Sequence, residues 1–254
     1  AAGISVLGAT TVNVGYNKIH TINQTGINTA TAPVVLGISL AGGLNVTAHN
    51  NFVADLNAVN TPYADAIRGI SVSSTTPLST YNLYHNSIHV NSASALATSG
   101  TSGIYHTTNA TATTAALNMI DNIIVNTSAS AGAGVTAAYR RSNATLTNFA
   151  STSNYNLLYA GTPSATNLIF YDGTNSDQTL AAYQARVAAR DANSISSFPN
   201  FTSSTDLHLT PDNCSIDSKG IPVAGFTNDI DADTRSITIP DMGADEFDAY
   251  NAGV

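Results

Sequence analysis

Short segments of alternating hydrophobicity recur about every 35 residues, and this repeat predicts an all-β fold, a parallel β-helix with about five regular three-strand coils. Two features recur at about this spacing: an asparagine, and a predicted strand that begins at a glycine. The asparagines are Asn17, Asn51, Asn86, Asn122 and Asn156, at steps of 34, 35, 36 and 34 residues. One strand cannot bury its apolar side chains alone, whereas stacked copies can.

Each predicted coil contains three strands. The first strands begin at Gly3, Gly37, Gly69, Gly103 and Gly134. A second, alternating segment is clearest at 44–50, 81–86 and 116–122, and a third follows the repeated asparagine. Because equivalent residues of successive coils lie about 4.8 Å apart, the asparagines should stack as an internal ladder of hydrogen-bonded amides.

Two of the six histidines lie in one repeat unit, YHNSIHV at 84–90. The residues that precede the repeated asparagine in successive coils are Tyr16, Asn50, His85, Asp121 and Tyr155. Such varied polar residues at one position favour a side-chain stack over a conserved chemical role for His85 and His89. His20 and His89 are two coils apart, which is too far to share a metal ion easily.

The regular coils should cover 1–159 of a single domain, 1–254, because the pattern breaks after Tyr159. The segment 160–197 reads as an irregular coil with one short helix near 177–190, in which Leu180, Tyr183 and Val187 share a face. Ser176 or Asp177 could cap its start. The segment 198–254 reads as a terminal coil and an acidic capping segment.

The C-terminal sequence carries a family resemblance. The stretches DANSISSFPNF, DLHLTPDNCSID and NDIDADTRSITIPDMGADEF resemble the C-terminal part of secreted right-handed parallel β-helix proteins of the pectate-lyase-like superfamily, common among Bacteroidetes surface and secreted proteins. The resemblance implies a right-handed helix, export by the type nine route and a chain excerpted from a longer polypeptide. It also implies that the last segment closes the open edge of the final coil. It does not imply one activity, because the superfamily contains lyases, hydrolases and adhesins.

The composition argues against some classes of binding partner. Only 9% of the residues are charged, about a third are Ser, Thr or Asn, and the formal net charge is −8. A chain without a basic stripe is a poor partner for nucleic acid or anionic membrane. No apolar run reaches the length of a membrane span. The single cysteine, Cys214, excludes an intramolecular disulfide and is expected to be a small buried residue.

The acidic segment suggests a metal site. Seven of the sixteen acidic residues fall between Asp229 and Asp248. Asp229, Asp231 and Asp233 alternate, and with Asp241 and Asp245 they could form an oxygen-only calcium shell. The spacing departs from an EF-hand, because Ala232 stands where glycine would ease the bend and no glutamate follows at the required distance. Hydrogen-bonded capping turns are the favoured alternative, and no cofactor is expected to be required.

Conventional catalytic constellations are not recognisable. A polysaccharide lyase needs cations and a base on one exposed sheet, but Arg68 and Arg140 fall at different phases of the repeat. A glycoside hydrolase needs two carboxylates on neighbouring coils. Asp121 and His85 lie one coil apart and could form an acid–base pair, although a structural contact is favoured. Asp121, His85 and Arg140 are therefore the only catalytic candidates.

The sequence favours a non-catalytic, rigid structural or adhesive module of a larger secreted cell-surface protein. Carbohydrate or other surface protein subunits are the expected partners, alongside flanking domains of the same polypeptide. The alternative is a carbohydrate-active enzyme, a polysaccharide lyase or glycoside hydrolase, acting on an extracellular polysaccharide.

Overall fold

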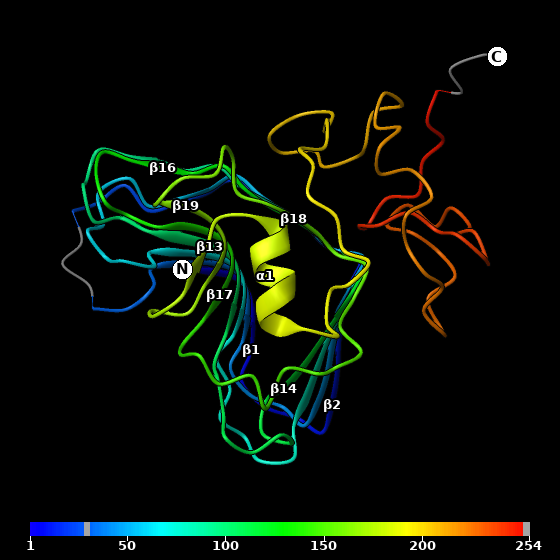
Figure 1. Ribbon diagram of the computed structural model, residues 1–254, viewed down its shortest axis with the longest axis horizontal. Helices are drawn as coiled ribbons and strands as arrows, with labels where there is room; N and C mark the ends of the chain where they lie inside the picture. Colours follow the sequence, from blue (N-terminus) through cyan, green and yellow to red (C-terminus); the bar gives the residue numbers. More distant parts are fainter. Residues whose placement is uncertain (28–30, 251–254) are drawn as a thin grey trace.

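The computed structural model describes residues 1–27 and 31–250, and it confirms the all-β prediction. The chain forms a parallel β-solenoid of about five turns with a single short helix (Figure 1). Strands of successive turns pair in parallel at sequence offsets that follow the asparagine steps, for example Lys18 with Phe52 and Ser87 with Ile123. The repeat in the sequence is therefore the repeat of the fold.

Three sheets run along the solenoid, and their parallel strands come from successive coils; only the last pair of sheet A, β19 and β20, is antiparallel. Sheet A contains, in order, β1 (Ala2–Val6), β5 (Val35–Leu40), β9 (Ile67–Val72), β13 (Thr101–His106), β17 (Thr136–Arg141), β19 (Asn167–Tyr171) and β20 (Ser176–Asp177). Sheet B contains β2 (Thr11–Gly15), β6 (Asn45–His49), β10 (Thr80–Tyr84) and β14 (Ala116–Ile120). Sheet C contains β3 (Lys18–Ile19), β7 (Phe52–Ala54), β11 (Ser87–Val90), β15 (Ile123–Asn126) and β18 (Leu157–Tyr159).

Two strand pairs are added outside these sheets: β4 (Ile22–Asn23) with β8 (Leu56–Asn57), and β12 (Ala93–Ser94) with β16 (Ala129–Ser130). The fifth coil is less regular than predicted. In place of a strand of sheet B it makes isolated bridges, in which Phe149 pairs with Leu117 and Asn154 with Ile120.

Inward-facing side chains stack in rows to form one continuous core. In sheet A one row consists of Ile38, Ile70, Ile104, Tyr139 and Phe170, all buried and in register. In sheet C the corresponding row is Val53, Ile88, Ile124 and Leu158. Because each residue packs on its equivalents above and below, burial is shared along the stack and stabilises it as a unit.

The asparagine ladder is confirmed. Each Nδ2 donates to the Oδ1 of the asparagine in the next coil, at 2.8 Å from Asn17 to Asn51 and 2.9 Å from Asn122 to Asn156. The ladder ends on two residues that the sequence analysis did not identify. Asn156 donates from Nδ2 to Asp191 Oδ1 and from its backbone N–H to Ser194 Oγ, both at 2.8 Å.

One glycine of the predicted series is out of register. Ser102 pairs with Ala137 and Ile104 with Tyr139, so the residue beside Gly103 is Ala138, and Gly134 lies four positions too early. The earlier coils need glycine here because space is lacking. A Cβ on Gly69 would lie 2.4 Å from Ile88 Cγ2 and 2.5 Å from the carbonyl oxygen of Gly103.

The predicted helix is α1 (Leu180–Val187), with Tyr183 and Val187 buried in the main core. Its N-cap is Thr179, whose Oγ1 accepts from the Ala182 N–H, and not Ser176 or Asp177 as predicted. Asp177 instead pairs with Arg186. Figure 1 shows α1 over the interior of the last coils, where it covers the end of the stack.

The C-terminal segment, residues 198–250, lies beside the solenoid and not across its open end (Figure 1). It packs against the outer face of sheet C, where Leu207, Ile230 and Ala244 contact Phe52 and Ala54. A second apolar cluster joins Leu209, Ile216 and Met242 to Ile123, Val125 and Leu157. The sequence analysis expected this segment at the final edge; the apolar outer face of sheet C is what holds it along the side. Cys214, expected to be buried, is exposed.

Candidate functional site

The residues that precede the ladder asparagines share an unusual backbone conformation. Tyr16, Asn50, His85, Asp121 and Tyr155 have φ values of 60°, 47°, 49°, 57° and 57°. Asparagine, aspartate and histidine adopt this left-handed region more readily than most residues, which accounts for Asn50, His85 and Asp121 but not for the two tyrosines. The turn directs these side chains outward at the corner between sheets B and C. The C-terminal segment covers three of them, Asn50, His85 and Asp121.

Asp121 is held by the C-terminal segment. The Ile221 N–H lies 3.1 and 3.2 Å from its two carboxylate oxygens, and the Gly243 N–H donates to its backbone carbonyl at 2.7 Å. Burial raises the pKa of Asp121 to about 8, although the Ile221 amide and the Arg235 guanidinium favour the charged form. At neutral pH this carboxyl group is therefore mostly protonated.

His85 is the neighbour of Asp121 in the row. Its Nε2 lies 3.7 Å from Asp121 Oδ2, which is too long for a hydrogen bond. Burial, together with the nearby Arg235 charge, lowers the pKa of His85 well below its usual value, so the ring is neutral. The two candidate residues are adjacent, as predicted, but both are uncharged and fully buried.

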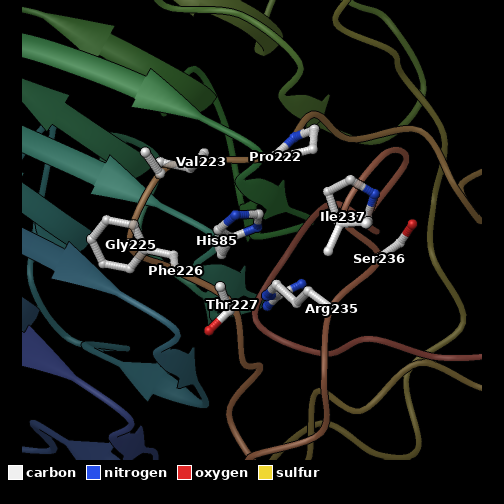
Figure 2. A pocket seen from close by; sticks show the side chains of 11 residues that line it. His85, Pro222, Val223, Gly225, Phe226, Thr227, Arg235, Ser236 and Ile237 are labelled. Atoms are coloured by element: carbon white, nitrogen blue, oxygen red, sulfur yellow. The ribbon is translucent and has the colours of Figure 1, made fainter.

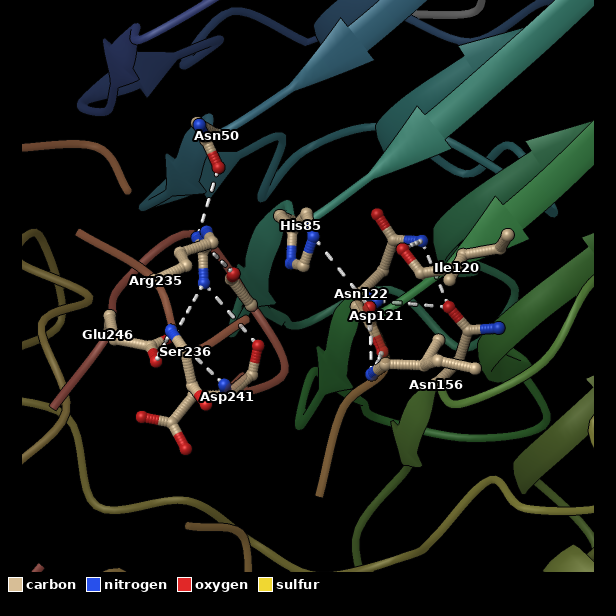
Figure 3. Close-up of polar contacts among 12 residues, drawn as sticks. Asn50, His85, Ile120, Asp121, Asn122, Asn156, Arg235, Ser236, Asp241 and Glu246 are labelled. Atoms are coloured by element: carbon tan, nitrogen blue, oxygen red, sulfur yellow. Dashed lines mark hydrogen bonds and ion pairs between the residues drawn. The ribbon is translucent and has the colours of Figure 1, made fainter. Parts of the chain in front are cut away.

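Arg235 connects the loop around it to the solenoid. Its Nη2 donates to Asn50 Oδ1 at 3.0 Å and to the Gly243 carbonyl at 2.9 Å, and its Nη1 lies 3.2 Å from Glu246 Oε2 (Figure 3). Glu246 also accepts from the backbone N–H groups of Ser236 and Asp241, at 2.8 and 2.9 Å. This network fixes the loop between Arg235 and Glu246 on the second coil.

A pocket of about 260 Å³ opens beside this network. Apolar side chains line most of it: Pro222, Val223, Phe226, Ile237 and Pro240. Figure 2 shows His85 between the segment that carries Val223 and Phe226 and the segment that carries Arg235 and Ile237. The sequence analysis missed this pocket, because its walls come from segments more than a hundred residues apart.

Arg140, the third catalytic candidate, lies on another face. It projects from β17 on the outside of sheet A, where its Nε is 3.2 Å from Asp65 Oδ1. Arg68 reaches the same carboxylate at 2.6 Å. The two arginines are in different rows, since Arg68 pairs with Ser102 and Arg140 with Tyr105, which agrees with their different phases in the sequence.

A second pocket of about 260 Å³ lies around these arginines. The Cζ of Arg68 is 3.3 Å from the ring centroid of Tyr105, and that of Arg140 is 4.9 Å from the centroid of Tyr171. Both carboxylates of this pocket are occupied. Asp65 binds the arginines, and Asp172 accepts from the N–H groups of Thr174 and Asn175. The pocket thus offers aromatic and cationic groups without the free carboxylate pair of a glycosidase.

The acidic residues proposed for calcium form turns. Asp229 is buried and accepts from the backbone N–H groups of Asp231 and Asp233 at 2.9 and 2.8 Å, and from that of Glu246 at 3.0 Å. Asp241 accepts from the N–H groups of Ser218 and Phe247, at 2.5 and 2.8 Å. Burial raises the pKa of Asp241 to about 7. These contacts match the capping-turn alternative.

The C-terminal segment also places a histidine among carboxylates. His208 contacts Asp206 through Nδ1 and Asp231 through Nε2, and Asp231 pairs with Lys18 of β3 at 2.9 Å. Burial lowers the pKa of His208, but the two carboxylates outweigh this and raise it overall. Ligand atoms of His208, Asp231 and Asp245 lie within 4.8 Å of one another, so these are the side chains best placed for a metal in the described part of the chain. Asp231 and Asp245 are among the acidic residues that the sequence analysis named as candidate calcium ligands, whereas His208 was not anticipated.

The fold defines the class of the protein as a parallel β-solenoid. Comparison with protein-family models, curated proteins and solved structures found no match. Within residues 1–27 and 31–250, no helix is long and apolar enough to cross a membrane.

Proposed function

We propose that this chain is a non-catalytic, rigid β-solenoid module, structural or adhesive, of a larger secreted cell-surface protein. One observation carries the proposal: the C-terminal segment is attached to coil after coil along the solenoid. Its attachments, from the first coil to the fourth, are Asp231 to Lys18, Asn228 to Asn50, Ala244 to Ser87, and Ile221 to Asp121.

This attachment supports a mechanical role. In a stack of repeats each coil contacts only its neighbours, so the terminal coils can separate one at a time. A segment that binds several coils couples them, and the internal amide ladder does the same from the inside. The module should resist bending and unravelling as one body.

The outer face of sheet A is the surface best suited to adhesion. Tyr105 and Tyr171 lie on strands two coils apart, with Arg140 on the strand between them. Aromatic rings and guanidinium groups can contact the apolar faces and the hydroxyls of sugars. The low charge of the chain and its abundance of Ser, Thr and Asn suit an extracellular surface of this kind.

The lack of an accessible acid–base pair among the candidates supports a non-catalytic role. Asp121 and His85 are fully buried, and Arg140 is on a different face, bound to Asp65. General acid–base catalysis requires groups that reach the substrate within hydrogen-bond distance.

A depolymerisation screen tests the proposal against the enzyme alternative. The purified chain is incubated with acidic and neutral polysaccharides, with and without calcium, and new reducing ends and unsaturated products are measured. We expect no turnover, but retention on at least one glycan that weakens in Tyr105→Ala. Turnover that is lost in Asp121→Asn or Arg140→Gln would instead establish an enzyme.

Mechanical stretching tests the structural role. We expect the chain, pulled from its two ends, to unfold in one cooperative step. Stepwise release of single coils at low force would contradict a rigid module.

A further inference from the structure

The pocket beside His85 contains buried polar atoms without partners. Within the described chain, neither ring nitrogen of His85 makes a hydrogen bond of good distance and angle, although the nearby backbone carbonyl of Asp241 favours the protonated ring, and Nε of Arg235 also has no hydrogen-bond partner. His85 is fully buried and Arg235 is 3% exposed, and both side chains line the pocket. Buried polar groups are nearly always hydrogen-bonded, because an unpaired one loses its hydration without compensation. A polar group that enters the pocket could bond to these atoms and offset that loss.

The charge of the site favours a neutral group. The imidazole of His85 is neutral, and the Arg235 charge is balanced by Glu246, 3.2 Å away. A carboxylate or ammonium ligand would lack an unpaired counter-charge here. A hydroxyl suits the site, because it can accept from the Arg235 Nε–H and donate to an imidazole nitrogen.

The side chains that line the pocket favour a single aromatic ring as the ligand. Pro222, Val223, Ile237 and Pro240 are apolar, and Phe226 is held by edge contacts with His49 and Tyr84, at 4.8 and 5.4 Å between ring centroids. The volume of about 260 Å³ lies below the range for drug-sized ligands. A sugar ring would bury several hydroxyls against walls that offer few unpaired polar side-chain atoms. A phenol ring has one hydroxyl and an apolar body.

The surface around the pocket indicates whether the aromatic ring belongs to a free molecule or to a polypeptide. Ile237, which is 83% exposed, lines the pocket, and Ile221 and Ile239, 38% and 54% exposed, directly precede its lining residues Pro222 and Pro240 in the chain. A free phenol would leave these isoleucines in water, whereas a polypeptide that inserts one side chain would cover them. We propose that the pocket binds the phenol ring of a tyrosine side chain carried by a partner polypeptide. This inference does not depend on the proposed function.

The test is a titration of the full chain followed by NMR. The probes are a capped Ser-Ile-Tyr-Ile-Ser peptide, its phenylalanine counterpart, and p-cresol. We expect the tyrosine peptide to cause saturable shifts at 222–227 and 235–237. The phenylalanine peptide should bind about fivefold more weakly, because it lacks the hydroxyl that pairs the buried nitrogens.

Three variants serve as controls. His85→Phe should abolish the preference for tyrosine over phenylalanine and keep the fold, because Tyr16 and Tyr155 occupy the same backbone position in other coils. Ile237→Ser removes an exposed lining side chain and should weaken both peptides. Leu7→Ser, at a 78% exposed residue of the first coil, should change neither.

Three results would overturn the inference. Shifts absent from 222–227 and 235–237 at the highest peptide concentration would mean that the pocket is not a site. Equal affinity for the two peptides would mean that the buried nitrogens do not recognise a hydroxyl. Affinity for p-cresol equal to that for the tyrosine peptide would mean that the ligand is a free phenol and not a polypeptide.

Discussion

Neighbouring residues at the corner of each coil have opposite roles. Asn86 points inward and bonds to the coils on both sides, whereas His85, one position earlier, points outward toward the C-terminal segment. The left-handed backbone at His85 causes this reversal. Asparagine suits the inward position because its amide donates two hydrogen bonds, to Asn122 and to the Ala48 carbonyl, and accepts from Asn51, whereas a hydroxyl has a single hydrogen to donate. The outward residue is free to vary with its surroundings.

Asn86→Ala should destabilise the protein strongly. The substitution removes the acceptor of the Asn51 backbone N–H and of one hydrogen of Asn51 Nδ2, and it removes the amide donor to Asn122 Oδ1 and to the Ala48 carbonyl, all in the core. Buried unpaired groups cost about 1–3 kcal/mol each, so we expect a loss of about 3 kcal/mol or more in the free energy of unfolding. Urea denaturation measures it. Asn45→Ala, at an exposed strand residue, is the control and should change it little.

Asp121 should make stability depend on pH. Its pKa is about 8 in the folded protein, against an ordinary value of 3.8, so the folded state binds the proton more tightly than the unfolded state. The contribution of Asp121 to the free energy of unfolding should therefore fall by a few kcal/mol as pH rises from about 4 to 8, whereas buried His85, with its lowered pKa, contributes in the opposite direction up to about pH 6.5. Asp241, with a pKa of about 7, adds to the trend of Asp121 up to that pH.

Asp121→Asn should remove much of this slope. Asparagine keeps the acceptor for the Ile221 N–H and tolerates the left-handed backbone, as Asn50 does in the second coil. Urea denaturation at pH 5 and pH 9 would compare the variant with the parent chain. Asp55→Asn, at another left-handed position, is the control. An unchanged pH slope in Asp121→Asn would contradict a buried, protonated Asp121.

At the scale of elements, the first strand of each coil lies very close to the backbone of the next coil and to a side chain of sheet C. Gly37, Gly69 and Gly103 meet the carbonyl oxygen of the next coil and a side chain of sheet C. In the fifth coil Ala138 takes this place. The sequence pattern located the first four glycines of the series but misplaced the fifth, because Gly134 imitates the motif and only strand pairing reveals the register.

Gly69→Ala should overpack this point. The added Cβ would lie 2.4 Å from Ile88 Cγ2 and 2.5 Å from the Gly103 carbonyl oxygen, and the backbone atom cannot yield without moving a strand. Overpacking of a core costs about 1–3 kcal/mol, so we expect a loss of that size and a lower melting temperature. Gly8→Ala, where nothing lies within 4 Å, is the matched control. Equal melting temperatures for the two variants would show that the strands can separate locally.

At the scale of the whole molecule, the C-terminal segment completes the solenoid. The outer face of sheet C carries Phe52, Ile123, Val125 and Leu157, and Figure 1 shows the segment along that side. Without it the apolar outer face would be exposed, as would Asp121 and His85. The buried pKa shifts, the pocket and the lengthwise attachment all depend on this one arrangement.

Removal of residues 198–254 should therefore expose an aggregation-prone face. We expect the shortened chain to self-associate and to bind a hydrophobic dye, because exposed apolar patches of this kind promote association. Size-exclusion chromatography measures the association. A monomeric shortened chain with the melting temperature of the parent would show that the solenoid is independent of the segment.

The sequence by itself determined the solenoid, its period, the amide ladder and the helix, because each of these follows from residues repeated at a fixed spacing or periodic along one element. It also brought His85 and Asp121 together as neighbours. Only the tertiary structure decided what covers them, because contacts such as that between Asp121 and Ile221 join residues 100 positions apart, with no periodicity to mark them. The capping turns, the pocket and the partners of Arg235 arise from that non-local packing, which burial of the outer face of sheet C drives.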